Sequence, residues 1–208
     1  NYQTKNVIYK KEYVINNDLL SYSDEQLMYL TLGHFGKGLA SVVGDSSRNA
    51  PGAAGETTLK IPQLNKSLVL ADGPAGLRLK QTYGIDNKGI YDIVCDPIVT
   101  HMVDFLPLKA ITKHFIAPDN SKRKGEIHHQ FTTAKPIGTA LAQSFNKQYV
   151  YEIGTIIKSE MEYFNVDLWL APAINIHRNI LCGRNFEYYS EDPFLSGVIA
   201  SFITKGVQ

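Results

Sequence analysis

The sequence has 208 residues, of which 44% are hydrophobic and 20% are charged, and its 21 Lys and Arg against 20 Asp and Glu leave a net charge of +1. This composition excludes a disordered tail, a collagen-like repeat and a disulfide-rich scaffold. The balanced charge gives no electrostatic case for a nucleic acid or an anionic membrane surface as the main partner. We therefore expect a globular protein with a packed core.

The cysteines and the apolar runs predict the compartment. Cys95 and Cys182 form neither a CxxC pair nor a closely spaced set, which favours free thiols over a disulfide framework. No apolar run approaches the roughly 18 residues that a membrane helix needs, and the first residues show no hydrophobic stretch of a signal peptide. We expect a cytoplasmic protein with no membrane partner.

Residues 1–58 are expected to form a lead-in segment, a helix and a Gly-rich loop. Ser23 with Gln26 three positions later is the signature of a capping box at a helix start, and Gly33 is the expected end of that helix. Residues 33–58 are rich in Gly and Ser, which predicts a long loop. Ordered loops of this length are usually functional.

Two short apolar runs predict buried parallel strands. The first is Leu68–Ala71, closed by Asp72, and the second is Asp167–Ala171, closed by Pro172. Between them, apolar residues recur at intervals of three and four over 138–164, which predicts one helix.

Another helix is expected after the second strand. Ser190 is its expected N-cap, Pro193 lies near its start, and the two acidic residues between them favour the positive helix end. Ile199 and Ile203 belong to its expected buried stripe. The order strand, helix, strand, helix is typical of the α/β class.

Residues 79–132 break this rhythm, because polar, aromatic and charged residues are mixed there without a clear period. We interpret this stretch as an insertion after the first strand. Its basic cluster, Lys122 to Lys124, is interpreted as a solvated loop.

The segment Asp72–Arg78 (DGPAGLR) lies just past the carboxyl end of the first strand, where α/β folds place their ligand sites. One interpretation is that Asp72 only closes an Asx-type turn before Gly73. The other is that its carboxylate binds a ligand, because an ionised carboxylate there needs donors such as sugar hydroxyls or an arginine. The residues alone leave both interpretations open.

A second segment rich in donors, acceptors and aromatic rings follows the second strand over residues 170–193. We expect Arg178 to form a structural ion pair with Glu187 or Glu191. Arg184 lies between a glycine and an asparagine and is expected to reach outward. Its fixed fork of donors matches vicinal hydroxyls or a carboxylate.

The remaining polar groups are given no role in chemistry. His128, His129 and His177 lack metal-ligand spacing, so no metal is expected. No phosphate-binding glycine motif follows a strand, which argues against a nucleotide-binding domain.

Asp72 and Glu187 could form a pair of carboxylates for glycoside hydrolysis, but we do not assign that pair.

Four segments resemble the N-terminal barrel domain of glycoside hydrolase family 3, the β-glucosidase and β-xylosidase family. They are LADGPAGLR (70–78), PIGTALAQSFN (136–146), LAPAINIHR (170–178) and CGRNFEYYSEDP (182–193). The resemblance covers roughly residues 50–208. It implies an α/β fold that is a portion of a (β/α)8 TIM-like barrel, incomplete within this chain. Residues 59–208 would be the first part of that barrel, with the insertion at about 79–132.

The resemblance also implies a function, namely part of a retaining, exo-acting β-glycosidase, with β-glucosidase as the first expectation. The implied partner is a β-linked glucoside or oligosaccharide, and no cofactor is implied. Asp72 matches the family aspartate that binds distal hydroxyls of the terminal sugar, and Arg78 and Arg184 match arginines of the same subsite.

No catalytic residue is expected among these 208 residues. In the family, the nucleophile belongs to a later Ser-Asp-Trp type motif and the acid/base to another loop or domain, outside the matched segments. We therefore expect the chain to be inactive alone, with the remainder of the enzyme supplied in cis or in trans.

Two further statements can be tested. Because the predicted strands are parallel, Asp72 and Arg184 should converge near the carboxyl ends of these strands.

The alternative function is a non-catalytic carbohydrate-binding or scaffold protein that kept the sugar pocket. Lys-His and Ser-Asp-Trp motifs in the coding sequence beyond Gln208 would favour the enzyme.

Overall fold

The computed structural model of the chain describes residues 17–33, 47–58, 65–93 and 123–208. Most of the expected lead-in segment, much of the Gly-rich loop, Cys95 and Lys122 lie outside these residues. Helices and strands follow one another along the chain in a mixed α/β fold. In order they are η1 (Asn17–Ser21), α1 (Asp24–Thr31), β1 (Gly55–Glu56), β2 (Val69–Ala71), β3 (Thr82–Asp86), β4 (Gly89–Asp92), β5 (Glu126–His129), α4 (Gly138–Gln143), α5 (Lys147–Tyr163), β6 (Leu168–Trp169), η3 (Asn185–Glu187) and α6 (Pro193–Val207).

A central sheet has the strand order β1-β2-β6. β2 and β6 are parallel, with Leu70 opposite Leu168 and Ala71 opposite Trp169. This pairing confirms that the two predicted strands are neighbours in one sheet. β1 runs antiparallel to β2, whereas all strands of a regular (β/α)8 barrel are parallel. The described residues therefore show a mixed sheet, and the partial barrel stays a prediction.

The helix predicted over 138–164 is two helices, α4 and α5. Phe145 between them has a φ of +49°, a left-handed conformation that cannot continue α4. The Asn146 side chain then accepts the Tyr149 N–H at 3.1 Å and caps α5. Phe145 fits the apolar period of residues 138–164 but is 74% exposed. The prediction of a single helix is wrong because the apolar period continues across Phe145 and Asn146, where the backbone conformation and the cap separate the two helices.

The start of α6 differs from the prediction by two residues. Asp192, not Ser190, is the N-cap, and its carboxylate accepts the Phe194 N–H at 2.9 Å. Ser190 instead accepts the Asp192 N–H on its hydroxyl oxygen at 3.1 Å. Pro193 occupies the first turn as predicted, where its missing N–H is no loss.

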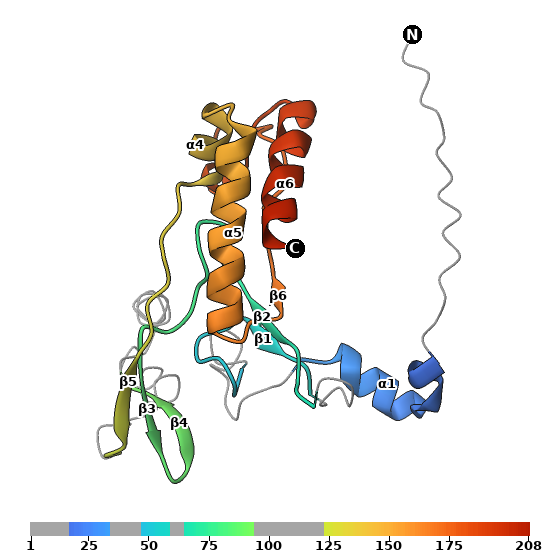
Figure 1. Cartoon of the computed structure of the whole chain (residues 1–208), viewed down its shortest axis with the longest axis vertical. Coiled ribbons are helices and arrows are strands. Elements are labelled where there is room, and N and C mark those ends of the chain that lie inside the picture. Colours follow the sequence, from blue (N-terminus) through green and yellow to red (C-terminus); the bar gives the residue numbers. More distant parts are fainter. Residues whose placement is uncertain (1–16, 34–46, 59–64, 94–122) are drawn as a thin grey trace, which may run out of the picture.

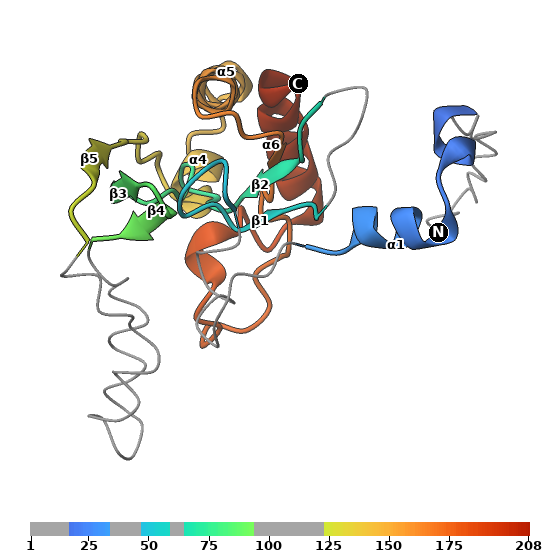
Figure 2. The same ribbon diagram turned by 90° about the horizontal axis from the view of Figure 1, so that it is seen from below.

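Helices α5 and α6 run side by side (Figures 1 and 2) and meet at two glycines. A Cβ on Gly154 of α5 would lie 2.4 Å from the carbonyl oxygen of Ile203. A Cβ on Gly206 of α6 would lie 2.2 Å from the carbonyl oxygen of Tyr151. Only glycine permits this approach, so the two residues set the spacing of the helices.

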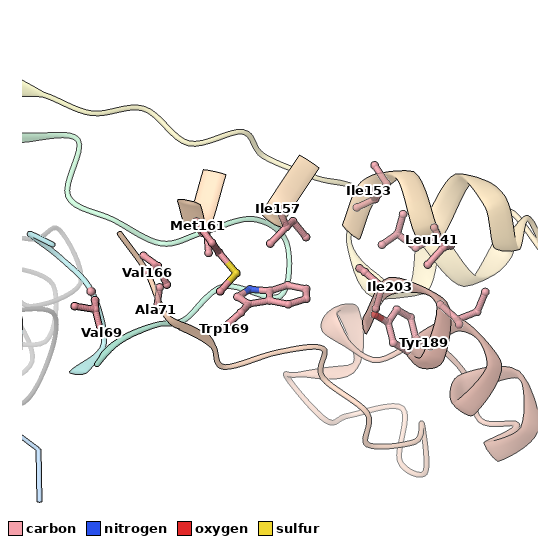
Figure 3. Close-up of a cluster of buried hydrophobic side chains, with 14 of the residues drawn as sticks. Val69, Ala71, Leu141, Ile153, Ile157, Met161, Val166, Trp169, Tyr189 and Ile203 are labelled. Atoms are coloured by element: carbon pink, nitrogen blue, oxygen red, sulfur yellow. The ribbon is translucent and has the colours of Figure 1, made fainter. Parts of the chain in front are cut away.

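The main core collects side chains from β2, β6, α4, α5 and α6 (Figure 3). Ile199 and Ile203 are each 1% exposed, which confirms the predicted buried stripe of α6. Ile157 of α5 is 0% exposed in the same core. Trp169 of β6 joins them from the sheet, with 8% of its surface exposed. Tyr189 belongs to the same cluster, and its burial raises the pKa of its hydroxyl.

Part of the predicted insertion forms a second sheet, antiparallel and in the order β4-β3-β5. Figure 2 shows it on one side of the central sheet, opposite α1. Within it, Arg123 Nε donates to Asp86 Oδ2 at 2.7 Å, and the Arg123 guanidinium lies 4.1 Å from the centre of the Tyr91 ring. The prediction of a solvated basic loop is therefore wrong for Arg123, whose partner is 37 positions away in the sequence.

Helix α1 begins at the predicted capping box. Ser23 Oγ accepts the Gln26 N–H at 3.3 Å, and Gln26 Oε1 accepts the Ser23 N–H at 2.9 Å. None of the residues of α1 is buried, and the helix lies apart from the central sheet in Figure 1. Within the four described ranges, no helix has the length and apolar character that crossing a membrane requires.

Candidate functional site

The loop after β2 is folded back by its own backbone. The Arg78 N–H donates to the Asp72 carbonyl at 2.9 Å, and the Gly76 N–H donates to the Gly73 carbonyl at 3.1 Å. Gly73 and Gly76 have φ values of +117° and +123°. A Cβ on Gly73 would lie 1.9 Å from the Gly76 carbonyl oxygen, so this turn requires glycine.

This fold brings Arg78 beside Asp72. Arg78 Nη1 lies 3.3 Å from Asp72 Oδ2, and the two side chains are 53% and 42% exposed. Among the described residues, no backbone N–H donates to the Asp72 carboxylate, so the Asx-turn interpretation is wrong. The half-exposed carboxylate retains acceptor capacity for a ligand.

Trp169 connects the second parallel strand to the same loop. Its indole Nε1 donates to the Gly73 carbonyl at 3.0 Å. Buried tryptophans usually find such a partner for the N–H. The bond ties the end of β6 to the loop that carries Asp72, a contribution that sequence reasoning did not identify.

Arg184 reaches this edge of the sheet from the segment after β6. Its guanidinium donates through Nε to Glu187, one 3₁₀ turn later, and its side chain is 70% exposed. The hydrogen bond with Glu187 raises the pKa of Arg184, the charge of Glu187 adds to this, and the charge of Asp72 also contributes. The charge of Asp72 thus acts on Arg184, but the ion pair of Asp72 within the described residues is with Arg78, so the convergence of Asp72 and Arg184 stays a prediction.

The predicted ion pair of Arg178 is wrong. In the part of the chain that the structure describes, Arg178 has no ion pair with Glu187 or Glu191, and Arg184 takes Glu187 instead. The reason is local. Glu187 follows Arg184 by three positions, and the 3₁₀ turn η3 brings residues with this spacing to the same side. A spacing of three was a signal that the sequence already contained.

Glu187 is buried and ion-paired. Its side chain is 8% exposed and faces the Arg184 guanidinium. A Cβ on Gly138 would lie 2.2 Å from the Glu187 carbonyl oxygen, so the start of α4 packs directly on this residue. Thr139 adds a hydrogen bond from its hydroxyl to the Tyr188 carbonyl at 2.9 Å. Gly138 and Thr139 are supporting residues that the sequence analysis missed, although the pair opens a helix in one of the four motifs.

The histidine of the segment has a structural partner. His177 Nε2 lies 2.8 Å from the Asn185 carbonyl oxygen, and the His177 N–H donates to the Ser190 carbonyl at 3.1 Å. Across the described ranges there is no group of three or more His, Cys, Asp or Glu side chains arranged to hold a metal ion.

These features define an α/β protein with a carboxylate and two arginines at the carboxyl edge of its parallel strands. Residues 112–208 match the family model of the glycosyl hydrolase family 3 N terminal domain. This match, over just under half of the chain, makes the chain similar to members of glycosyl hydrolase family 3.

Curated relatives align over about a third of the chain. Beta-glucosidase A of Butyrivibrio fibrisolvens is 52% identical over 77 residues, which are 37% of this chain and 9% of the relative. Thermostable beta-glucosidase B of Acetivibrio thermocellus is 45% identical over 76 residues, 36% of this chain and 10% of the relative. Exo-alpha-(1→6)-L-arabinopyranosidase of Bifidobacterium longum is 41% identical over 76 residues, with the same shares. The matched part thus spans about a tenth of each relative's length.

Solved structures align over most of the chain. Beta-glucosidase 3B from Thermotoga neapolitana in complex with glucose has a TM-score of 0.62 and 36% identity, and the match covers 92% of this chain and 21% of that one. Beta-glucosidase from Kluyveromyces marxianus in complex with glucose has a TM-score of 0.55 and 21% identity, covering 92% and 16%. This second likeness supports the fold alone.

Proposed function

We propose that this chain is part of a retaining, exo-acting β-glucosidase and that it binds the terminal sugar of a β-linked glucoside or oligosaccharide. The arrangement of Asp72, Arg78 and Arg184 carries the proposal. These residues come from two loops about a hundred positions apart, yet Asp72 pairs directly with Arg78 and its charge also acts on Arg184. The names of the relatives support the choice of glucose as the sugar.

Each of the three residues has a chemical role in the proposal. The Asp72 carboxylate accepts hydrogen bonds from two vicinal sugar hydroxyls, and such bonds to an ionised acceptor are among the strong ones. The guanidinium groups of Arg78 and Arg184 donate to hydroxyl oxygens on either side of Asp72. The interactions favour catalysis if they strengthen as the sugar ring distorts toward the transition state.

The proposal places the nucleophile and the acid/base on the remainder of the enzyme, in cis or in trans. A retaining mechanism needs two carboxyl groups roughly 5 Å apart. Glu187 is buried against Arg184 and Asp72 is paired with Arg78, so neither is offered as that pair. The solved relative is about five times as long as the matched region, which leaves ample chain for the other groups.

The test is the kinetics of Asp72→Asn in the full-length protein that contains this chain. The variant keeps the size of the side chain but removes its charge, so kcat/KM for an aryl β-glucoside should fall by about a hundredfold or more. Glu162→Gln, an equivalent change at an exposed position on α5, is the control and should stay within about twofold of the wild type.

Two outcomes would contradict the proposal. A loss below about threefold for Asp72→Asn would show that this carboxylate does not bind the reacting sugar. Glucose binding by a full-length protein that turns over no aryl glycoside would instead favour the non-catalytic carbohydrate-binding or scaffold alternative.

A further inference from the structure

A short backbone segment, residues 132–135, lies under the loop that carries Asp72 and Arg78. The Lys135 N–H donates to the Ala75 carbonyl at 2.7 Å, and Thr132 Oγ1 donates to the Leu77 carbonyl at 2.6 Å. A Cβ on Gly76 would lie 2.3 Å from the Thr133 carbonyl oxygen. The segment, which we call the support segment, therefore contacts the loop at three successive residues.

Glu160 of α5 binds the support segment through two of its residues. Its Oε1 accepts the Thr133 N–H at 3.0 Å and lies 3.5 Å from Lys135 Nζ. The exposed fractions of the two side chains are 3% for Lys135 and 15% for Glu160. A lysine so deeply buried requires a charged partner, because an unpaired charge in the interior is costly.

The pair is not saturated with hydrogen bonds. Glu160 Oε2 is buried and has no hydrogen-bond partner among the described residues. Within the described residues, the hydrogen-bond acceptor of Lys135 Nζ is the Glu160 carboxylate. Apolar side chains alone could hold the support segment by packing, and replacing a buried ion pair by such residues is often neutral or stabilising. A poorly satisfied pair beneath the ligand-facing loop therefore favours a role in placing that loop.

We propose that Lys135 and Glu160 are positioning residues, which hold the Asp72–Arg78 loop in the orientation that binds the sugar. The inference rests on the proposed function for its consequence in catalysis. Its structural part concerns only the contacts between α5, the support segment and the loop. Loss of the pair should loosen the loop without unfolding α5, because the helix keeps its apolar contacts with α6 and the sheet.

The experiment measures hydrogen exchange and kinetics in the full-length protein. The double variant Lys135→Met, Glu160→Ala removes both charges together, so no buried charge is left unpaired to unfold the protein. Exchange of the peptide spanning residues 73–78 should become about tenfold faster or more, whereas the peptide spanning 194–203 in α6 should be unchanged. The double variant Lys135→Met, Glu160→Gln also leaves no buried charge unpaired but keeps an acceptor for the Thr133 N–H, so it should show a smaller increase. Glu162→Gln on the same helix should show none.

Kinetics separates positioning from a purely structural role. For an aryl β-glucoside, the double variant should raise KM by about tenfold and lower kcat less, because ground-state binding of the sugar is weakened first. Exchange of residues 73–78 at the wild-type rate in the double variant would overturn the inference while leaving the role of Asp72 intact. A wild-type protein without glycosidase turnover would contradict the proposed function, and the exchange rates would still decide whether the pair positions the loop.

Discussion

The central sheet with α5 and α6 and the small sheet β4-β3-β5 are stabilised in different ways. The first depends on apolar burial, with Ile157, Ile199 and Ile203 almost fully enclosed. The second has little buried apolar surface, and its centre is the Arg123 guanidinium between the Asp86 carboxylate and the Tyr91 ring. The loop with Asp72 and Arg78 extends from the apolar part. It leads into β3, so the loop connects the two parts.

The largest expected effect is on the apolar part. Ile203→Ala removes a side chain that is 1% exposed and should lower the free energy of unfolding by about 2–5 kcal/mol, through lost burial and the remaining cavity. Ile156→Ala on α5, where 43% of the side chain is exposed, should cost well under half as much. Urea denaturation followed by the fluorescence of Trp169, the single tryptophan of the sequence, measures both. Equal losses would mean that α6 is not packed as described.

A smaller effect is expected where the two helices meet. Gly154→Ala places a methyl group 2.4 Å from the Ile203 carbonyl oxygen, and overpacking of this kind costs about 1–3 kcal/mol. Gly197→Ala on α6 is the matched control, because a Cβ there meets no atom within 4 Å. It should stabilise the protein by up to about 1 kcal/mol, since alanine is the better helix former. Melting temperatures that move in the same direction for both variants would contradict the close approach.

The smallest effect concerns pH and the small sheet. Hydrogen bonds from Arg123 lower the pKa of the Asp86 carboxyl from its usual 3.8 to about 2. A carboxyl with a lowered pKa in the folded state contributes stability above its unfolded pKa and loses it as the pH falls through its folded pKa. Amide exchange protection in β3–β5 should therefore decrease between about pH 4 and pH 2, whereas α5 and α6 keep theirs.

Asp86→Asn is the control for this pH dependence. The variant cannot ionise, so protection of the small sheet should already be reduced at neutral pH and should change little on acidification. A pH response that persists unchanged in the variant would assign it to another group.

The two parts also differ in how far the sequence predicts them. The strands at 68–71 and 167–171 and the stripe of α6 follow from local apolar patterns, and the structure confirms them. The partnership of Asp86 and Arg123 depends on the register of three strands, which no local pattern specifies. Long-range polar contacts within residues 79–132 therefore could not be predicted from the sequence.

Errors near the candidate site have local causes. Phe145 was assigned to a helix because its apolar side chain fits the period, but its left-handed backbone and the Asn146 cap end the helix there. The ion pair was predicted for Arg178 and not for Arg184, because the prediction did not take into account the 3₁₀ turn that brings Arg184 and Glu187 together. The convergence of Asp72 and Arg184 stays a prediction, which rests on parallel strands bringing their carboxyl ends to one edge.

The central claim is that Asp72, Arg78 and Arg184 together bind the terminal sugar. A crystal structure of the full-length protein with bound glucose tests it most directly. Hydroxyl groups of the sugar should lie within about 2.6–3.2 Å of the Asp72 carboxylate and of at least one guanidinium of Arg78 or Arg184. Glucose bound at the active site with all three side chains beyond hydrogen-bond distance would contradict the claim.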